Sequence, residues 1–353
     1  MEKKSVTNLF NGGVVINGNV FEKKQTNLKR NRNLSNFKNL STVNDEIKLP
    51  INNSFNCAII NDFRFGGFII AFRISNHIDK TNYKEIDDLH SKYIGVCRLD
   101  SDLNYIKGSM FVLSEEWIID PRLLWVNNKL LITCCKIDTG LDYIVGSFIL
   151  DYDKSEIFNN SDFFRVSPNS SDRQKNWVPF YQNNKLYFIA SINPHVVYEY
   201  CLLTYKVIDV FKHVYNFKWI NNEKFLRGNT PPILLDNGEY LNTFHTTENI
   251  LINGITTRYY DNGFYTFESK PPFKPKKLSN ISYLYAEMAS RKFYSYDSKP
   301  FNSQDKNMSC QCTFPLGMVN LGDDILISYG DRDSLIKYIK IPKKAILNTL
   351  KLI

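Results

Sequence analysis

The chain is predicted to fold as an all-β, five-bladed β-propeller with a short C-terminal helix. A turn-plus-strand pattern recurs five times, a proline-marked strand precedes four of the five copies, and long helical periodicity is nearly absent. A pattern that repeats every fifty or so residues is typical of proteins built from similar blades. A β-sandwich and a pair of smaller β-domains are the alternatives.

Each copy of the pattern begins with Gly, Asn or Asp and continues as a mostly apolar strand that ends in a polar group. Asn-Asn, Asn-Gly and Gly-Asp between apolar runs are signals of a β-hairpin turn. The copies are GGFIIAFRIS from Gly66, NNKLLITCCKI from Asn127, NNKLYFIASINPH from Asn183, NGEYLNTFHTT from Asn237 and GDDILISYGDRD from Gly322.

A second strand comes before each copy, and in four cases it contains proline: IDPRLLWV, NWVPFYQ, GNTPPILL and CTFPLGMV. The first copy is preceded by NNSFNCAII, which has no proline. We expect the proline of Asp120-Pro121-Arg122 to mark the entry of an inner strand. The C-terminal IPKKAILNTLKLI is predicted to be helical, with Pro342 near the helix start.

Length and composition favour a folded protein with a large core. The 353 residues are 43% apolar and 14% aromatic, which argues against global disorder. No apolar run is long enough to cross a bilayer, and the N-terminus makes a poor signal peptide. We therefore expect no transmembrane segment.

The positive charge is concentrated at the N-terminus. The formal net charge is +8, and residues 1–49 contain nine Lys/Arg and four Asp/Glu, a net charge of +5. We predict a basic, partly ordered extension over 1–49 and a catalytic propeller over 50–353. A solvated arm is favoured over nuclear targeting or an anionic partner, and no nucleic-acid partner is expected.

The seven cysteines do not form a disulfide pattern. Their number is odd, and Cys134 and Cys135 are adjacent and therefore point to opposite faces of a strand. Reduced, buried thiols in a cytoplasmic protein are the expectation. Core packing of Cys310 and Cys312 is favoured over zinc binding. For the short DYD and DRD patterns at 151–153 and 331–333, a role in turns or sugar contacts is favoured over metal binding. We expect a metal-independent site and no cofactor.

In a propeller the innermost strands surround a central channel, so equivalent polar residues of different repeats converge. A ring of amides, cations and carboxylates above an apolar core suits a hydroxyl-rich ligand, and Trp177, with Trp117, Tyr187 and Phe244, offers flat faces for sugar rings. The alternative is that these groups satisfy one another. The ring residues that we expect to bind substrate are Asn56, Arg73, Asp120, Arg122, Lys175, Asn176, Asn193, His195, Arg227, Asn229, His245, Tyr260, Asp331 and Asp333.

Four motifs over residues 50–340 resemble a known family: DPR at 120–122, RGNTPPI at 227–233, FPLG at 314–317 and YGDRDS at 329–334. Their order resembles that of glycoside hydrolase family 130, which holds β-mannoside phosphorylases and β-1,2-mannosidases on a five-bladed propeller. The chain is equally similar to the mannosyltransferases and phosphorylases of glycosyltransferase family 108.

The resemblance implies roles for individual residues. Asp120 matches the catalytic acid, or the base in the synthetic direction, and Arg73 resembles an arginine of the sugar and phosphate pocket. His245 and Asp333 match a histidine and a sugar-binding aspartate, and Arg227 lies where the phosphorylases tend to carry lysine. One departure is Asn193, which replaces a phosphate-binding arginine and lowers the expectation of plain phosphorolysis.

The balance of charges distinguishes the reactions that such a site could perform. Inverting hydrolysis needs an acid and a base about 6.5–9.5 Å apart, for which Asp331, Asp333, Glu115 and Glu116 are the candidates beside Asp120. Phosphorolysis and transfer need one carboxyl group and a cationic cradle.

The many cations favour an inverting glycosyl transfer on β-mannosides with a phosphate-bearing donor or product. An inverting β-mannosidase and a non-catalytic sugar-binding propeller are the alternatives. The expected partners are a sugar or oligosaccharide acceptor and a sugar phosphate, a nucleotide sugar or inorganic phosphate, and a homo-oligomer is left open.

Overall fold

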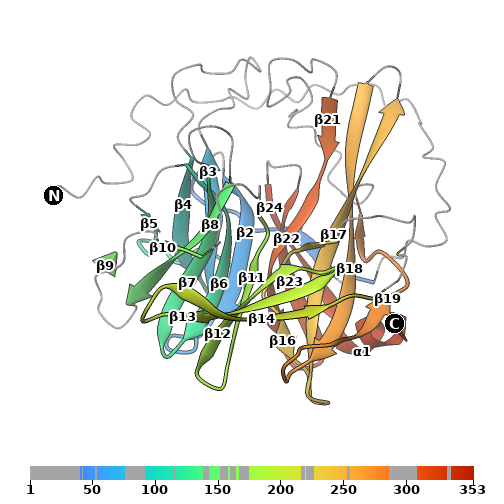
Figure 1. Ribbon diagram of the computed structural model, residues 1–353. Coiled ribbons are helices and arrows are strands. Elements are labelled where there is room, and N and C mark those ends of the chain that lie inside the picture. The colour runs from blue at the N-terminus through green and yellow to red at the C-terminus, as the bar shows by residue number, and fades with distance from the viewer. Residues whose placement is uncertain are drawn as a thin grey trace.

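The computed structural model describes residues 40–41, 43–51, 54–75, 92–113, 117–137, 143–151, 158–159, 164–166, 175–215, 219, 226–252, 255–285, 308–331 and 335–353. These residues form five separate β-sheets, the blades of a five-bladed β-propeller (Figure 1). The predicted fold class is therefore confirmed. Each blade is built around an antiparallel meander of strands that are consecutive in the sequence, and blade 4 also contains one parallel pair, β18 with β21.

Blades 1 and 3 each contain four strands, and blade 2 contains five. Blade 1 contains β2 (Ser54–Asn61), β3 (Phe68–Ser75), β4 (Lys92–Leu99) and β5 (Phe111–Val112). Blade 2 contains β6 (Ile118–Val126), β7 (Lys129–Ile137), β8 (Tyr143–Asp151) and β10 (Phe164–Arg165), and β9 (Phe158–Asn159) also pairs with β8. Blade 3 contains β11 (Val178–Gln182), β12 (Lys185–Ser191), β13 (His195–Cys201) and β14 (Lys206–His213).

The last two blades are extended by segments from elsewhere in the chain. Blade 4 contains β15 (Arg227–Gly228), β16 (Ile233–Leu234), β17 (Glu239–Ile252), β18 (Ile255–Glu268) and β19 (Pro275–Ser279). It also includes β20 (Leu284–Tyr285), β21 (Met308–Gln311) and β25 (Leu350–Leu352). Blade 5 contains β22 (Thr313–Asn320), β23 (Asp324–Asp331), β24 (Leu335–Pro342) and β1 (Val43–Glu46).

The five predicted hairpin strands all exist, and each leads into the middle of its blade as β3, β7, β12, β17 or β23. Their turns use left-handed backbone: φ is 47° and 62° at Asn127 and Asn128, and 50° and 60° at Asn183 and Asn184. Asparagine and glycine are the residues that adopt this conformation at least cost. The turn chemistry of the sequence therefore placed these hairpins correctly.

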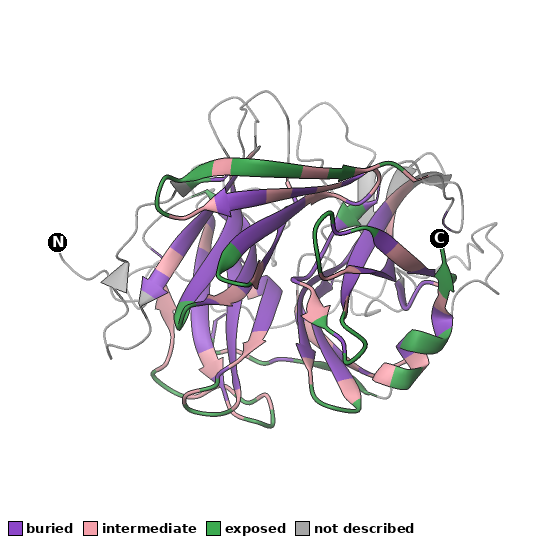
Figure 2. Ribbon diagram, turned by 60° about the horizontal axis from the view of Figure 1, so that its bottom comes forward, coloured by how far each residue is buried: buried purple, intermediate pink, exposed green. Residues whose placement is uncertain are grey.

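The apolar core of the described residues is divided among the five contacts between neighbouring blades. One cluster of buried residues joins blades 1 and 2, and others join blades 2 and 3, 3 and 4, 4 and 5, and 5 and 1. Figure 2 shows the buried residues within the sheets and the exposed residues at turns, the outer strand β14 and the helix. Burial between blades is thus the main source of cohesion.

The two ends of the described chain complete blades 5 and 4. Strand β1 pairs with β24, so residues 43–46, predicted as part of the N-terminal extension, form the outer strand of blade 5. Helix α1 (Lys343–Thr349) follows Pro342 as predicted, but Leu350–Leu352 leaves the helix and pairs with β19. Among the described residues, no helix is long and apolar enough to cross a membrane.

Candidate functional site

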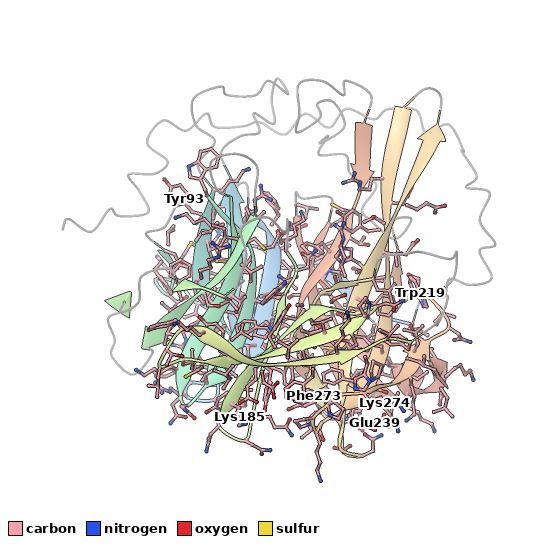
Figure 3. The ribbon with its side chains drawn as sticks, in the orientation of Figure 1. Tyr93, Lys185, Trp219, Glu239, Phe273 and Lys274 are labelled. Carbon is pink, nitrogen blue, oxygen red and sulfur yellow. The ribbon has the colours of Figure 1, made fainter. Side chains whose placement is uncertain are left out.

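The candidate site lies toward the ends of the strands opposite the hairpin turns. In Figure 3, Lys185 and Glu239 lie low in the view, next to the turns of blades 3 and 4, and Tyr93 lies near the upper end of blade 1. Tyr93 pairs with Ile74, next to Arg73 near the end of β3. Because β3, β7, β17 and β23 all run away from the turns, their last residues gather at this upper end.

Asp120 is directed by a β-bulge in β6. Ile119 lies opposite Cys135 and Arg122 opposite Thr133, so Asp120 and Pro121 together face Cys134 alone. Asp120 also has a positive φ of 55°. A bulge bends the strand and redirects a side chain, and proline is tolerated there because the ladder is already interrupted. The expectation that Pro121 marks the strand entry is wrong, since β6 begins at Ile118.

Blade 1 carries the same device at Asn56. This residue is the extra one between Phe55 and Cys57, and its φ is 51°. Its Nδ2 donates a hydrogen bond to Oδ1 of Asp120 at 3.2 Å, and both side chains are buried. The two bulges therefore bring an amide donor and the proposed catalytic carboxyl together across neighbouring blades.

Blade 5 reaches the same place through a glycine. A Cβ atom at Gly330 would lie 1.8 Å from Oδ1 of Asn56, so no other residue type fits there without a shift. Next to it, Ser328 Oγ donates to the backbone carbonyl of Cys57 at 2.6 Å. Gly330 belongs to the YGDRDS motif, and its requirement is one of close packing.

Arg122 joins three blades from within. Its side chain is only 1% exposed, its Nε donates to the carbonyl of Asn229 at 2.6 Å, and its Nη2 donates to Gly228 O and Asn176 Oδ1. Its Nη1 donates to the carbonyl of Asp120 at 3.3 Å. These partners all belong to the protein, so Arg122 holds the backbone of Asp120 and of blade 4 in place.

Blade 4 contributes His245, held by a chain of amides. His245 Nδ1 and Asn229 Oδ1 are 2.5 Å apart, and Asn229 Nδ2 donates to Asn262 Oδ1 at 3.0 Å. Asn262 then reaches blade 5 by donating to Thr313 O at 3.0 Å. Tyr260 stacks on the imidazole ring, with 5.2 Å between the ring centroids and 22° between the planes.

The electrostatic environment of His245 is cationic. Burial is the main cause that holds the pKa of His245 well below its usual value, and the charges of Arg227, Arg122 and Lys175 lower it further. His245 is therefore neutral at physiological pH. The same cations are suitable partners for an anionic ligand group.

Arg73 is a second buried cation. Its side chain is 7% exposed and its guanidinium carbon lies 4.8 Å from the centroid of the Phe55 ring. Its Nε has no hydrogen-bond partner among the described residues. A buried guanidinium with an unused donor is a favourable place for a ligand acceptor atom.

Several predicted site residues lie elsewhere or have other partners. His195 is buried among aromatic residues at the start of β13, with its Nε2 3.5 Å from Tyr265 Oη, and burial lowers its pKa to about 3. Asn193 is half-buried in the turn before it. Asp331 is buried and forms an ion pair with Lys337 at 3.6 Å. Asp333, Glu115 and Glu116 lie outside the described residues.

Most of the expected aromatic platforms are core residues. Trp177 is buried between blades 2 and 3, where it stacks on Tyr198 with 4.9 Å between ring centroids. Tyr187 and Phe244 are buried between blades 3 and 4. Trp117 is 39% exposed and packs against the Lys92 ammonium. The expectation of sugar-stacking faces thus survives only for Trp117.

One residue of the network, Asn262, is not among the predicted site residues. Asn262 lies inside the mostly aromatic stretch YYDNGFY of β18. The signal in the sequence is an asparagine within this stretch, because an amide that is buried, as Asn262 is, needs several partners. Among the described residues, no group of three His, Cys, Asp or Glu side chains is arranged to hold a metal ion.

Similar folds occur among solved structures. A β-1,2-mannobiose phosphorylase from Listeria innocua superimposes with a TM-score of 0.55 and 13% identity, over 88% of this chain and 94% of the other. A mannose phosphorylase from Leishmania mexicana, in complex with phosphate, gives a TM-score of 0.53 and 11% identity over 87% and 88%.

A third similar structure is described with the GH130 mannoside phosphorylase family and its glycoside hydrolases, which target β-1,2-mannosidic linkages in Candida mannan. It gives a TM-score of 0.50 and 11% identity over 83% and 85%. At these identities the likeness is one of fold. No protein-family model and no curated protein sequence matches the chain.

Proposed function

We propose that this chain is a carbohydrate-active enzyme that transfers a β-mannosyl unit with inversion, and that a phosphate group is the other reactant. The observation that carries the proposal is Asp120, a buried carboxyl aimed by a bulge and held by Asn56. Arg122 donates to the backbone of Asp120 and to that of Asn229, whose side chain contacts His245 among further cations. The similar folds of two mannoside phosphorylases support the choice of sugar and of phosphate.

In the phosphorolytic direction, a phosphate oxygen attacks the anomeric carbon on the face opposite the glycosidic oxygen. The bond between that carbon and the glycosidic oxygen breaks as Asp120 gives its proton to the departing oxygen. The products are an α-sugar 1-phosphate and an alcohol. One carboxyl group suffices because phosphate is already an anionic nucleophile. In the reverse direction the Asp120 carboxylate takes the proton of the acceptor hydroxyl.

The remaining residues divide into cations and sugar contacts. We assign Arg73, Arg227 and Lys175 to the anionic oxygens, because cations that hydrogen-bond phosphate provide both charge and geometry. Arg122 and Asn176 position Asp120 and blade 4. Tyr260, His245, Asn229 and Asp333 are proposed for the sugar.

The test is the Asp120→Asn variant, supplied with β-1,2-mannobiose and inorganic phosphate and assayed for α-mannose 1-phosphate. Removing a general acid costs about 10²- to 10⁴-fold in rate, so kcat should fall by that range while the thermal midpoint stays close to wild type. The Asp236→Asn variant is the matched control, because its exposed carboxyl lies at the hairpin turn of blade 4. Wild-type turnover by Asp120→Asn would refute the assignment.

Hydrolysis is the second candidate, favoured by Asn193, which lies where the resemblance expects a phosphate-binding arginine. The same assay separates the two reactions. Release of free mannose at a rate independent of phosphate would identify a β-mannosidase. Binding of mannobiose without either product would identify a sugar-binding propeller.

A further inference from the structure

Asn262 of β18 is fixed in one orientation by backbone carbonyls. Its side chain is fully buried, and its Nδ2 donates to Leu284 O at 2.8 Å, to Thr313 O at 3.0 Å and to Thr313 Oγ1 at 3.1 Å. A carbonyl oxygen only accepts hydrogen bonds, so the NH₂ group of Asn262 must face these atoms. Its Oδ1 must then face Asn229.

The orientation of the Asn262 amide determines the orientation of the Asn229 amide. Because Asn262 presents an acceptor, Asn229 must present its own NH₂ group, and the Nδ2–Oδ1 distance of 3.0 Å agrees. The other end of the Asn229 amide, Oδ1, then lies 2.5 Å from Nδ1 of His245. A flipped Asn229 would place two acceptors against each other, which a buried site strongly disfavours.

The orientations of Asn262 and Asn229 determine which ring nitrogen of His245 carries the proton. An amide oxygen accepts only, so Nδ1 of His245 is the protonated nitrogen. A neutral imidazole carries one N–H, which leaves Nε2 with a lone pair. Among the described residues, the hydrogen bond of the His245 ring is the one at Nδ1.

The groups around the ring keep it neutral. Arg227 from β15, Arg122 from β6 and Lys175 from the segment before β11 all oppose a positive charge on His245. Tyr260 from β18 covers one face of the ring, and Phe314 from β22 packs against it edge-on. The neighbourhood therefore combines cations with one neutral acceptor.

We infer that Asn262, acting through Asn229, is a positioning residue that holds His245 as the Nδ1–H tautomer, so that Nε2 accepts a hydrogen bond from a hydroxyl group of the ligand. This inference rests on the proposed function for its ligand and on the amide network for its geometry. The hydroxyl belongs either to the sugar or to a monoprotonated phosphate. A ligand that presents only acceptor oxygens to His245 is disfavoured.

The direct test is long-range ¹H–¹⁵N NMR of histidine-labelled wild-type protein. The chain has only five histidines, and the signal lost in the His245→Gln variant identifies the residue. We expect a protonated Nδ1 and an unprotonated Nε2, unchanged between pH 8 and pH 5. An Nε2–H tautomer, or an imidazolium in this range, would overturn the inference whatever the enzyme does.

The ligand is tested in the same spectra by adding mannose or inorganic phosphate separately. A shift of the Nε2 resonance with mannose alone assigns the hydroxyl to the sugar, and a shift with phosphate alone assigns it to a protonated phosphate. If neither compound at saturation moves the resonance, the ligand part of the inference is wrong. The tautomer result needs no turnover, so it stands or fails separately from the proposed function.

The role of Asn262 is tested by Asn262→Leu, which removes the amide but keeps a similar volume. We expect His245 to lose its single tautomer and kcat/KM to fall roughly 10- to 100-fold, as for other partners that orient a functional histidine. Thr313→Val is the matched control for the tautomer, because two carbonyl acceptors still hold Asn262. An unchanged tautomer in a folded Asn262→Leu protein would show that Asn262 does not position His245.

Discussion

Asp120 and Arg122 are separated by one residue, and both are buried polar groups stabilised by neighbouring blades. Asp120 accepts a hydrogen bond from the Asn56 amide of blade 1. Arg122 donates hydrogen bonds to carbonyl groups of blade 4 and to Asn176 before blade 3. An isolated buried charge costs several kcal/mol, so such groups persist only with partners of this kind. The polar ring is therefore both a candidate site and a set of links between blades.

The burial of His195 should make the free energy of unfolding depend on pH. Burial lowers the pKa of His195 to about 3, below the value of about 6.5 expected in the unfolded chain. The unfolded state therefore takes up protons first as the pH falls. Stability is complete above pH 6.5 or so and is lost progressively as the pH falls from there toward 3.

For His195 alone, the free energy of unfolding should fall by about 2 kcal/mol between pH 7.5 and pH 5.0. The ring packs against Phe267 and Tyr265, so His195→Phe keeps an aromatic side chain at this place. Urea unfolding of both proteins at the two pH values measures the effect. An equal loss of stability in the variant would contradict the assignment of this loss to His195.

Among the strands, the inner ones direct their polar side chains through β-bulges and left-handed residues. The bulges at Asn56 and Asp120 and the left-handed Asn176 before β11 occupy comparable places in three successive blades. The polar residues interrupt apolar runs in the sequence, but the interruption alone does not identify a bulge. A bulge is a property of the register between two strands. The sequence of one strand therefore predicts the strand but leaves the direction of Asp120 undetermined.

The hairpin turns were predictable because their chemistry is local. Asn127 and Asn128 need positive φ, and asparagine supplies it cheaply. Trp177 and His195 were misjudged for the opposite reason, since their burial depends on how neighbouring blades pack. Residue type alone does not distinguish an aromatic ring at a channel from one in a core.

The turn of blade 2 offers a test of this local control. Asn128 is exposed and its φ is 62°, which a β-branched residue adopts only with strain. We expect Asn128→Val to lower the free energy of unfolding by about 1–2 kcal/mol. Asn128→Gly, the matched variant, should be neutral or slightly stabilising. Equal stabilities for the two variants in urea unfolding would mean that the turn tolerates another backbone conformation.

For the whole molecule, the repeats in the sequence made the number of blades predictable. The strand that completes blade 5 was not predictable. Five turn-plus-strand copies imply five blades, because each copy needs a neighbour to bury its apolar face. The strand that completes blade 5 is VNDE, four exposed residues with no apolar alternation. Nothing in the sequence of this short segment indicates a strand, which is why it falls within the predicted extension over 1–49.

The closing strand β1 should contribute measurably to the stability of the whole propeller. Residues 43–46 pair with β24, Asn44 Oδ1 accepts a 2.9 Å hydrogen bond from Tyr329 Oη, and Ile47 is buried in the cluster between blades 5 and 1. Loss of a buried isoleucine alone costs about 2–5 kcal/mol. A chain that lacks residues 1–47 should therefore unfold at a clearly lower temperature than one that lacks residues 1–39.

The comparison between the two shortened chains measures β1 and Ile47 together with Leu40, which packs against the cluster between blades 4 and 5, because the chains differ only by residues 40–47. Ile47→Ala in the full chain provides the matched point variant and should show part of the same loss. Thermal unfolding followed by circular dichroism measures all three. Equal midpoints for the two shortened chains would mean that blade 5 closes without β1, and that the propeller begins at residue 50 as the sequence predicted.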